Sequence, residues 1–447
     1  MTPGKKETVH IVGAGLAGSE CAYQLAQMGY SVKLYEMRPK TMTPAHKTSG
    51  FAELVCSNSL GSQTDYSAPG QLKWEAHQLH SLILKSAQKA SVPAGMSLSC
   101  DRQKFSDTVT EALRNHSRIS IETQEIQSLS DVPRPCVIAT GPLTSPELSR
   151  SLLEHFGDEF CYFFDAIAPI IDADSINCDI AFKANRNQEG EGDYLNCPLN
   201  KEQYFHLMEE ISNAEKVVPK EFENTPYFDG CMPIEVMVER GPLTAKHGPM
   251  SPKGLPLPGT DNKWAFAVVQ LRQENKEATA YNMVGFQTKM KYGEQVRIFR
   301  MIPGLEDAEF LKLGSIHRNL FIHSPKKLNQ DLSSKKDPLL FFAGQITGVE
   351  GYFESTCTGL LVAQFIDQKL NDRSFTPPPR ASAIGSLLNA ITEPKDHFQP
   401  TNINFGLLPP LNEPPPKGRK KWPRKEKRDR QLEIAKEAFE SFLTTLT

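Results

Sequence analysis

The sequence predicts an α/β fold in which a doubly wound parallel sheet is interrupted by an inserted α+β domain. Three observations support this prediction. A short apolar run, Thr8–Val12, leads through a glycine-rich turn into a helical pattern, which is the order of a strand–turn–helix unit. Near the other end of the chain, Leu339–Ala343 again precedes a glycine loop and a helical pattern. Between about residues 165 and 315, short runs separated by turns replace this alternation of strand and helix.

The first unit continues into a second strand. Apolar residues recur at helical spacing from Ala17 to Met28, Gly29 ends this helix, and Ser31–Glu36 alternates as a strand does. Met37–Gly70 is predicted as one long loop, and loops of that length inside a domain tend to be functional. Further elements are expected at Leu72–Ala90 (helix), Asp101–Asn115 (helix), Pro135–Thr140 (strand), Gly351–Leu370 (helix) and, at the end of the chain, an amphipathic helix with Leu432, Ala435, Phe439, Phe442, Leu443 and Leu446 on its apolar face.

The composition is that of an ordinary globular protein: 447 residues, 39% hydrophobic and 23% charged. No run approaches the roughly 18 apolar residues of a membrane span, and the first residues do not resemble a signal peptide, so we expect a cytoplasmic protein without membrane contact. The nine cysteines include no Cys-x-x-Cys pair, which argues against a disulfide framework and against a metal site. We expect most to be buried thiols, among them Cys21, Cys136 and Cys357.

The first turn carries a dinucleotide-binding motif. Gly13 allows the tight turn, Gly15 lets the backbone approach a pyrophosphate, and Gly18 lets the helix pack close to its strand. The free N–H groups at the start of the helix favour phosphate there. Glu36, at the end of the second strand, is expected to bind a ribose hydroxyl and disfavours a 2′-phosphate. The full motif, which fits G-x-G-x-x-G, consists of Gly13, Ala14, Gly15, Leu16, Ala17 and Gly18.

Two later segments favour FAD over NAD at this site. A buried strand ends in Thr140 and Gly141, and a second one leads through Gly344 and Gln345 into a helix that starts near Gly351 and Tyr352. The N-terminus of that helix can face the flavin pyrimidine and stabilise the negative charge of a reduced flavin. The fold is therefore predicted as a Rossmann-like FAD-binding domain formed by residues 1–164 and 316–376. Residues 165–315 form the inserted domain, and residues 377–447 a Pro-rich linker, a basic arm and the closing helix.

The basic arm, Lys417–Arg430, has nine Lys and Arg residues against one Glu and one Asp, in a chain whose net charge is −3. A solvated charge run is the usual explanation of such a stretch. Because the rest of the chain is acidic, we favour an arm that binds anions, with Lys420, Lys421, Arg424 and Lys425 as its contact residues.

Nine blocks of the sequence closely resemble one family, the bacterial folate- and FAD-dependent tRNA (uracil-5-)-methyltransferases. The similarity extends over essentially the whole chain, and Arg38–His46 and Cys56–Leu60 are specific to this family. A more distant family, the larger subunit of the tRNA uridine carboxymethylaminomethyl-modification enzyme, shares the flavin motifs but is longer and is not similar at the Cys56 block. The blocks are Gly13–Glu20, Glu36–Pro39, Met42–His46, Cys56–Leu60, Ala139–Thr144, Asp193–Pro198, Val269–Gln273, His317–Asn319 and Ala343–Ser355.

The resemblance implies an activity and a set of site residues. The family reduces FAD with NADH or NADPH, takes a methylene from 5,10-methylenetetrahydrofolate and transfers it to carbon 5 of the T-loop uridine of tRNA. Cys231 matches the presumed nucleophile of the family, and Cys56 a second cysteine near the flavin. His317 matches a histidine that stacks on the folate, and the matching blocks place Arg38 and Asn58 at the cofactor.

The chemistry is consistent with these residue types. Uracil carbon 5 becomes nucleophilic only after a group adds to carbon 6, and a thiolate adds and leaves readily. The target base must be flipped out of the folded RNA, and the basic arm suits contact with its backbone. Three alternatives remain open from the residues alone: the same reaction on ribosomal RNA, an RNA-binding flavoprotein with structural FAD, and a plain NAD(P)H oxidase.

Overall fold

The computed structural model describes residues 7–157, 161–188, 190, 192–217, 232–395, 398–419 and 421–446; for residues 161–167 and 315–318 it describes the backbone alone. Two separate hydrophobic cores lie in these residues. Within the described residues, no helix combines the length and hydropathy needed to cross a membrane.

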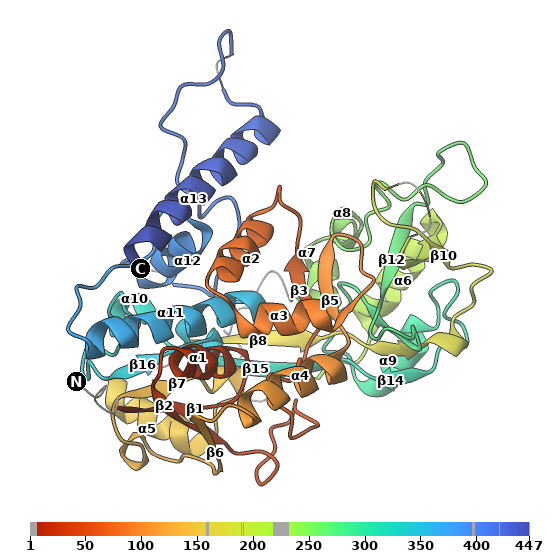
Figure 1. Ribbon diagram of the computed structural model, residues 1–447. Coiled ribbons are helices and arrows are strands. Elements are labelled where there is room, and N and C mark those ends of the chain that lie inside the picture. Colours follow the sequence, from red (N-terminus) through yellow and green to blue (C-terminus); the bar gives the residue numbers. More distant parts are fainter. Residues whose placement is uncertain are drawn as a thin grey trace.

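A five-stranded parallel sheet forms the larger unit of the molecule (Figure 1). Its order places β16 beside β7 although about 200 residues separate them in the chain, which confirms the predicted doubly wound α/β class. The strands, from one edge to the other, are β16 (Leu340–Phe342), β7 (Cys136–Ile138), β1 (Thr8–Val12), β2 (Ser31–Glu36) and β6 (Ile119–Thr123).

Helices α1 (Leu16–Gln27) and α11 (Tyr352–Leu370) pack against each other over this sheet (Figure 1). A Cβ atom at Gly359 would collide with the carbonyl of Ala17, so glycine is what allows the two helices to approach so closely. Both helices begin at the carboxyl end of a strand, β1 and β16, and their N-termini therefore meet at the same edge of the sheet.

A six-stranded antiparallel sheet with its own core forms a second body, which we call the six-stranded unit. All of its strands lie between residues 170 and 312, inside the range predicted for the inserted domain. Helices α6 (Lys201–Asn213), α7 (Ile234–Arg240), α8 (Thr244–His247) and α9 (Tyr292–Phe299) belong to the same stretch of chain. The strand order is β10 (Phe182–Lys183), β11 (Leu195–Leu199), β12 (Ala267–Gln273), β13 (Ala280–Met283), β9 (Ile170–Asp172) and β14 (Phe310–Lys312).

A two-stranded antiparallel ribbon joins the two units. The chain enters the six-stranded unit through β8 (Cys161–Ile167) and leaves it through β15 (Ser315–Phe321), and the two strands pair along their full length. Along the chain, α5 (Pro146–Phe156) precedes this ribbon and α10 (Ser324–Lys327) follows it.

The predicted long loop and the helix after it needed correction. The loop contains a strand, β3 (Ser59–Ser62), which pairs with β5 (Ser97–Cys100) and through it with β4 (Ser91–Val92). The predicted helix over Leu72–Ala90 is two helices, α2 (Ala68–Gln78) and α3 (Leu82–Lys89), followed by α4 (Arg102–Arg114). The break has no Gly or Pro; His80 has a φ of 58°, and Ser81 caps α3 by accepting from the N–H of Leu84.

A helix that was not predicted, α12 (Ala383–Thr392), lies between the Pro-rich stretches Pro377–Pro379 and Pro409–Pro416. The buried carboxylate of Glu75 accepts hydrogen bonds from the N–H groups of Ala383 and Ile384 at its start. The closing helix, α13 (Arg424–Leu446), is confirmed, and its buried face includes Leu432, Ala435, Phe439 and Phe442. It projects from the α2 side of the molecule (Figure 1).

Candidate active site and cofactor cavity

A cavity opens at the edge of the parallel sheet where α1 and α11 begin, with about 1050 Å³ of space that is free of protein atoms and partly open to solvent. Of the residues predicted to bind FAD, the cavity is lined by Gly13, Gly15, Leu16, Ala17, Glu36, Arg38, Thr140, Gly141, Gly344, Gln345 and Tyr352.

The glycine turn fits a dinucleotide. Gly13 has a φ of 101°, and a Cβ atom there would lie 2.6 Å from the carbonyl oxygen of Ala139. At Gly18 a Cβ atom would collide with the carbonyl of Gly13, so this glycine is needed for helix and turn to pack. At Gly15, by contrast, a Cβ atom would meet nothing within 4 Å. The space above Gly15 therefore belongs to the cavity and is where a pyrophosphate can approach the backbone.

The two helix N-termini at the cavity have no side-chain caps. Gly15 caps α1 and Gly351 caps α11, and neither can supply a hydrogen-bonding side chain. Their first N–H groups and the positive ends of both helix dipoles favour negative charge at this edge of the sheet. Gly351 itself lies on the wall of a neighbouring pocket rather than on that of the main cavity.

Glu36 and Arg38 form a buried ion pair on the cavity wall. One carboxylate oxygen of Glu36 accepts from the N–H of Ala14 (3.1 Å) and from Nη2 of Arg38, and the other accepts from the backbone N–H and Nε of Arg38. Burial raises the pKa of Glu36, but the hydrogen bonds and charge of Arg38 outweigh it and the pKa is lowered overall. A ribose hydroxyl that binds Glu36 must therefore share an oxygen with one of these donors.

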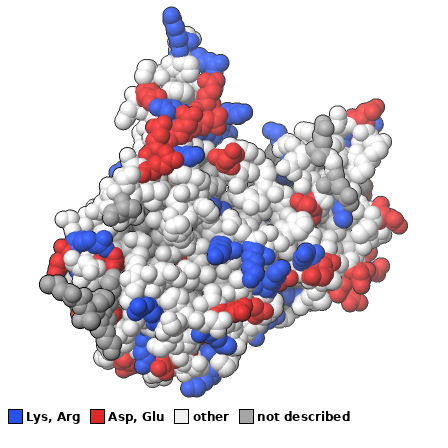
Figure 2. Space-filling view, viewed as in Figure 1, with Lys and Arg blue, Asp and Glu red and all other residues white. Residues whose placement is uncertain are grey.

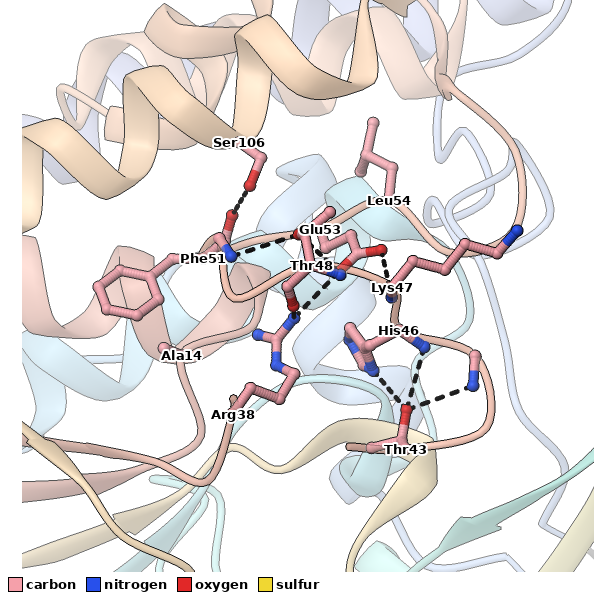
Figure 3. A network of polar contacts seen from close by, with 12 residues as sticks. Ala14, Arg38, Thr43, His46, Lys47, Thr48, Phe51, Glu53, Leu54 and Ser106 are labelled. Atoms are coloured by element: carbon pink, nitrogen blue, oxygen red, sulfur yellow. Dashed lines mark hydrogen bonds and ion pairs between the residues drawn. The ribbon is translucent and has the colours of Figure 1, made fainter. Parts of the chain in front are cut away.

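The loop after β2 closes the cavity with a second carboxylate, Glu53 (Figure 3). Glu53 accepts from Nη1 of Arg38 (3.2 Å) and from the backbone N–H groups of Lys47 and Thr48. It therefore folds the loop back onto Arg38, which it shares with Glu36.

His46 lies on the same wall and is held neutral. Thr43 Oγ1 accepts from the N–H groups of Ala45 and His46, so its own proton points to Nδ1 of His46, 2.6 Å away (Figure 3). Burial and the nearby Arg38 lower the pKa of His46 to about 4. The cavity wall therefore carries an uncharged imidazole near neutral pH.

A second pocket, of about 710 Å³, adjoins the cavity and contains Cys56 on its wall. Asn319 of β15 and Glu350 also line it. The cavity and the pocket share Val55, Pro142, Leu143, Gln345, Tyr352 and Ser355. Cys56 is half-buried, whereas Cys21, Cys136 and Cys357 are fully buried and their thiol pKa values are raised by burial, as expected of structural cysteines.

Comparisons with known proteins decide the family. A family model described as glucose inhibited division protein A matches residues 8–374. A protein of Bdellovibrio bacteriovorus named methylenetetrahydrofolate--tRNA-(uracil-5-)-methyltransferase TrmFO is 66% identical over 440 residues, which cover 98% of this chain and 98% of that protein. A protein of the same name from Bartonella henselae is 52% identical over 434 residues, 94% of this chain and 92% of that protein. The chain belongs to the TrmFO family.

The resemblance noted from the sequence blocks is thereby confirmed. Among solved structures, the GidA protein of Aquifex aeolicus superposes with a TM-score of 0.67 at 15% identity, covering 98% of this chain and 74% of that chain. At this identity the likeness concerns the fold alone, and it agrees with the α/β class of the TrmFO-family chain.

Asn58 of this TrmFO-family chain forms hydrogen bonds with both units. It is fully buried and lines neither the cavity nor the pocket. Its Nδ2 donates to the carbonyls of Cys100, Gln273 and Glu274, and its Oδ1 accepts from Nε of Arg272 at 3.0 Å. These hydrogen bonds join the two units, and the contact of Asn58 with the cofactor stays a prediction. Ala14 and Gly18 also lie behind the cavity wall, where they support the turn.

Two other predicted residues, His317 and Cys231, lie partly or wholly outside the described residues. His317 lies in β15, where its backbone pairs with Asp165, but its side chain is outside the described residues. Cys231 is outside them altogether. Both roles remain predictions. No group of three or more His, Cys, Asp or Glu residues that could hold a metal ion occurs in the described part of the chain.

In the basic arm of this TrmFO-family chain, some cations form ion pairs and others do not. Arg430 is paired with Glu413 (2.6 Å) and Glu433 (3.0 Å), and Arg419 with Glu426 (3.0 Å). Lys421, Arg424 and Lys425 are exposed and have no ion pair with another described residue, whereas Lys420 is not described. Figure 2 shows basic side chains at the tip of the arm and acidic ones along the helix beneath it. The tip is therefore the part with cations available to a partner.

Several residues of the site had no predicted role. Thr43 and His46 lie in a block quoted for the family resemblance, and that block was the available signal. Arg102, Glu274 and Lys312 hold the Cys56 loop, as described below, and no local pattern marks them. They meet only because the six-stranded unit packs against the loop.

Proposed function

We propose that this TrmFO-family protein forms 5-methyluridine in the T-loop of tRNA. The carbon donor is 5,10-methylenetetrahydrofolate, and NADPH or NADH supplies the electrons through FAD. The names of its relatives state the folate, the tRNA and carbon 5 of uracil for those proteins.

One observation carries the proposal: Cys56 lines a pocket whose wall is shared with the cavity above the glycine turn. A substrate in the pocket would contact Tyr352 and Gln345, which also face the cavity. This arrangement supports a reaction between a bound substrate and the cofactor. A protein that keeps FAD for structure alone has no need of a second pocket there.

Residues of the cavity fit each part of FAD. Gly13, Gly15 and the N-terminus of α1 suit the pyrophosphate, Glu36 the ribose, and Gly344 with the N-terminus of α11 the flavin ring. When bound and reduced by NADPH or NADH, FAD would supply the hydride, and with it the two electrons, that the transferred methylene needs to become a methyl group.

The protein has to make carbon 5 of uracil nucleophilic. A thiolate that adds to carbon 6 forms a C–S bond and places electron density on carbon 5, which then bonds to the methylene carbon. The bonds from that carbon to the folate nitrogens break, and tetrahydrofolate leaves. Loss of the proton from carbon 5 and expulsion of the thiolate restore the ring. Cys231 is the predicted nucleophile, and Cys56, on the wall of the adjoining pocket, would assist proton removal or protect the reacting carbon.

The reaction is tested with purified protein, NADPH and methylenetetrahydrofolate labelled in the methylene carbon. We expect label in 5-methyluridine at the T-loop of a tRNA transcript, located by mass spectrometry of nuclease fragments. A ribosomal RNA fragment of equal length with uridine in a similar loop serves as the competing substrate. Label in the ribosomal fragment but not in tRNA would support the alternative target. NADPH oxidation without label in either RNA would contradict the proposed transfer.

A further inference from the structure

The six-stranded unit presents a polar face to the loop that carries Cys56. Along β12, Val269 and Leu271 belong to the core of the unit, so Gln270 and Arg272 point to the opposite face. Glu274 follows directly after the strand and is buried. A sheet face of this kind is stable only when other polar groups satisfy it.

Arg102, the first residue of α4, satisfies part of this face. Its Nε and Nη2 donate to the two carboxylate oxygens of Glu274, at 2.6 and 3.2 Å. The same guanidinium donates to two backbone carbonyls of the Cys56 loop, from Nη2 to Cys56 (2.9 Å) and from Nη1 to Leu54. One planar cation therefore joins the six-stranded unit to the loop.

Lys312 is a second cation that binds the backbone of the Cys56 loop. It comes from β14 of the six-stranded unit, and its Nζ donates to the carbonyl of Val55 at 3.1 Å. Three consecutive carbonyls, those of Leu54, Val55 and Cys56, thus accept hydrogen bonds from cationic side chains. The backbone of Cys56 has little freedom while both cations stay in place.

We propose that Arg102, oriented by Glu274, is a positioning residue that fixes Cys56 in the pocket. The position of the Cys56 thiol therefore depends on the contact between the six-stranded unit and the loop. The inference rests on the proposed function for the role of Cys56 in methylation. The physical basis is that removing one partner of a buried ion pair leaves a desolvated charge, which the loop can relieve only by moving.

The test measures the reactivity of Cys56 without requiring turnover. Flavin-loaded protein is treated with iodoacetamide, and alkylation of each cysteine is followed by peptide mass mapping. Arg102→Lys keeps the charge but cannot bind Glu274 and both carbonyls at once, and Glu274→Gln removes the carboxylate that orients Arg102. We expect alkylation of Cys56 to accelerate at least about tenfold in both variants. The exposed Cys178 should react at an unchanged rate in the same samples.

A matched control uses Arg134, whose Nε pairs with Asp337 at 2.8 Å in a similarly half-buried position that does not contact the loop. Arg134→Lys should leave the alkylation of Cys56 unchanged. Combining Arg102→Lys with Glu274→Gln should add little to either single change, because both act through one contact. Melting temperatures and flavin content show whether each variant is folded.

Two results would overturn the inference: unchanged Cys56 reactivity in the folded Arg102 and Glu274 variants, or an equal acceleration in Arg134→Lys, which would indicate general loosening. The proposed function fails by a different result, namely NADPH oxidation by the native protein without transfer of label to RNA. The two failures are therefore distinguishable.

Discussion

The hydroxyl of Tyr352 accepts a hydrogen bond from the backbone N–H of Cys56, 2.6 Å away. Tyr352 is the first residue of α11, and its side chain lies on the wall shared by cavity and pocket. The bond links the helix whose N-terminus faces the cavity to the loop that carries the cysteine. A displacement of α11 should therefore displace the Cys56 loop, and a displacement of the loop should displace α11.

Tyr352→Phe tests this link. The variant leaves the N–H of Cys56 without its acceptor, at a cost of roughly 1 kcal/mol, while the ring keeps its packing. We expect methylation to slow by about fivefold and flavin content to stay near normal, measured by labelled transfer to tRNA and by absorbance. Loss of flavin at unchanged turnover per bound flavin would instead assign the hydroxyl to cofactor binding.

Gly15 and Gly18 should respond differently to added side chains. Gly15→Val places its side chain in open space, so the fold should persist while the pyrophosphate is blocked and bound FAD falls severalfold or more. Gly18→Ala should lower stability first, because its Cβ atom would collide with the Gly13 carbonyl. Flavin content and melting temperature of both purified variants check this. A Gly15→Val protein that retains full flavin content would contradict the cavity assignment.

The sequence predicted the strand–glycine turn–helix unit because its constraints are local. Gly13, Gly15 and Gly18 act through the backbone of one turn, and Glu36 lies at a fixed offset from them. Nothing in the sequence indicated the hydrogen bonds of Asn58, because they reach Arg272 and Glu274, more than 200 residues away in the chain. The helix α12 was missed because a buried carboxylate from α2, rather than a local sequence signal, completes its start.

Acidification should destabilise the protein through His46. Its folded pKa is lowered from 6.5 to about 4 by burial and by Arg38, so between these pH values the unfolded chain binds the proton and the folded chain does not. The contribution to stability is complete above pH 6.5 and decreases as the pH falls towards about 4. Melting temperature measured against pH should show this decrease, and His46→Gln should reduce it. Replacing the exposed His77 by Gln is the control and should leave the profile unchanged.

The tip of the arm should determine the salt dependence of RNA binding. Neutralising Lys421, Arg424 and Lys425 together should weaken tRNA binding and reduce the slope of log K against log salt by roughly 2 to 3, because fewer counterions are released. Arg430→Gln should have a smaller effect, since Glu413 and Glu433 already balance that charge. Filter binding at several salt concentrations measures both. Equal slopes in the triple variant and the native protein would show that the tip does not contact the RNA backbone.

Cys231 and Cys56 should have different roles, Cys231 at the uracil base and Cys56 beside the cofactor. The thiol that adds to carbon 6 has to reach a flipped base, and Cys231 is the residue predicted to do so. Cys231→Ala should abolish the covalent complex with tRNA carrying 5-fluorouridine, because no nucleophile is left to add, while flavin content stays normal. Cys56→Ala should lose methylation as well. Since Cys56 lines the pocket beside the cavity, its defect should appear in the flavin spectrum or in proton removal.

The assay separates these roles because 5-fluorouridine stops the reaction after the C–S bond has formed, when no proton can leave carbon 5. A protein that lacks only the proton-removing group still forms this complex, and a protein without the nucleophile does not. Gel electrophoresis under denaturing conditions counts the complex, and absorbance of the flavin is read on the same samples. Cys357→Ala is a control for the loss of a thiol, because Cys357 is fully buried in α11 and does not line the pocket. A complex that persists in Cys231→Ala and disappears in Cys56→Ala would reverse the two assignments.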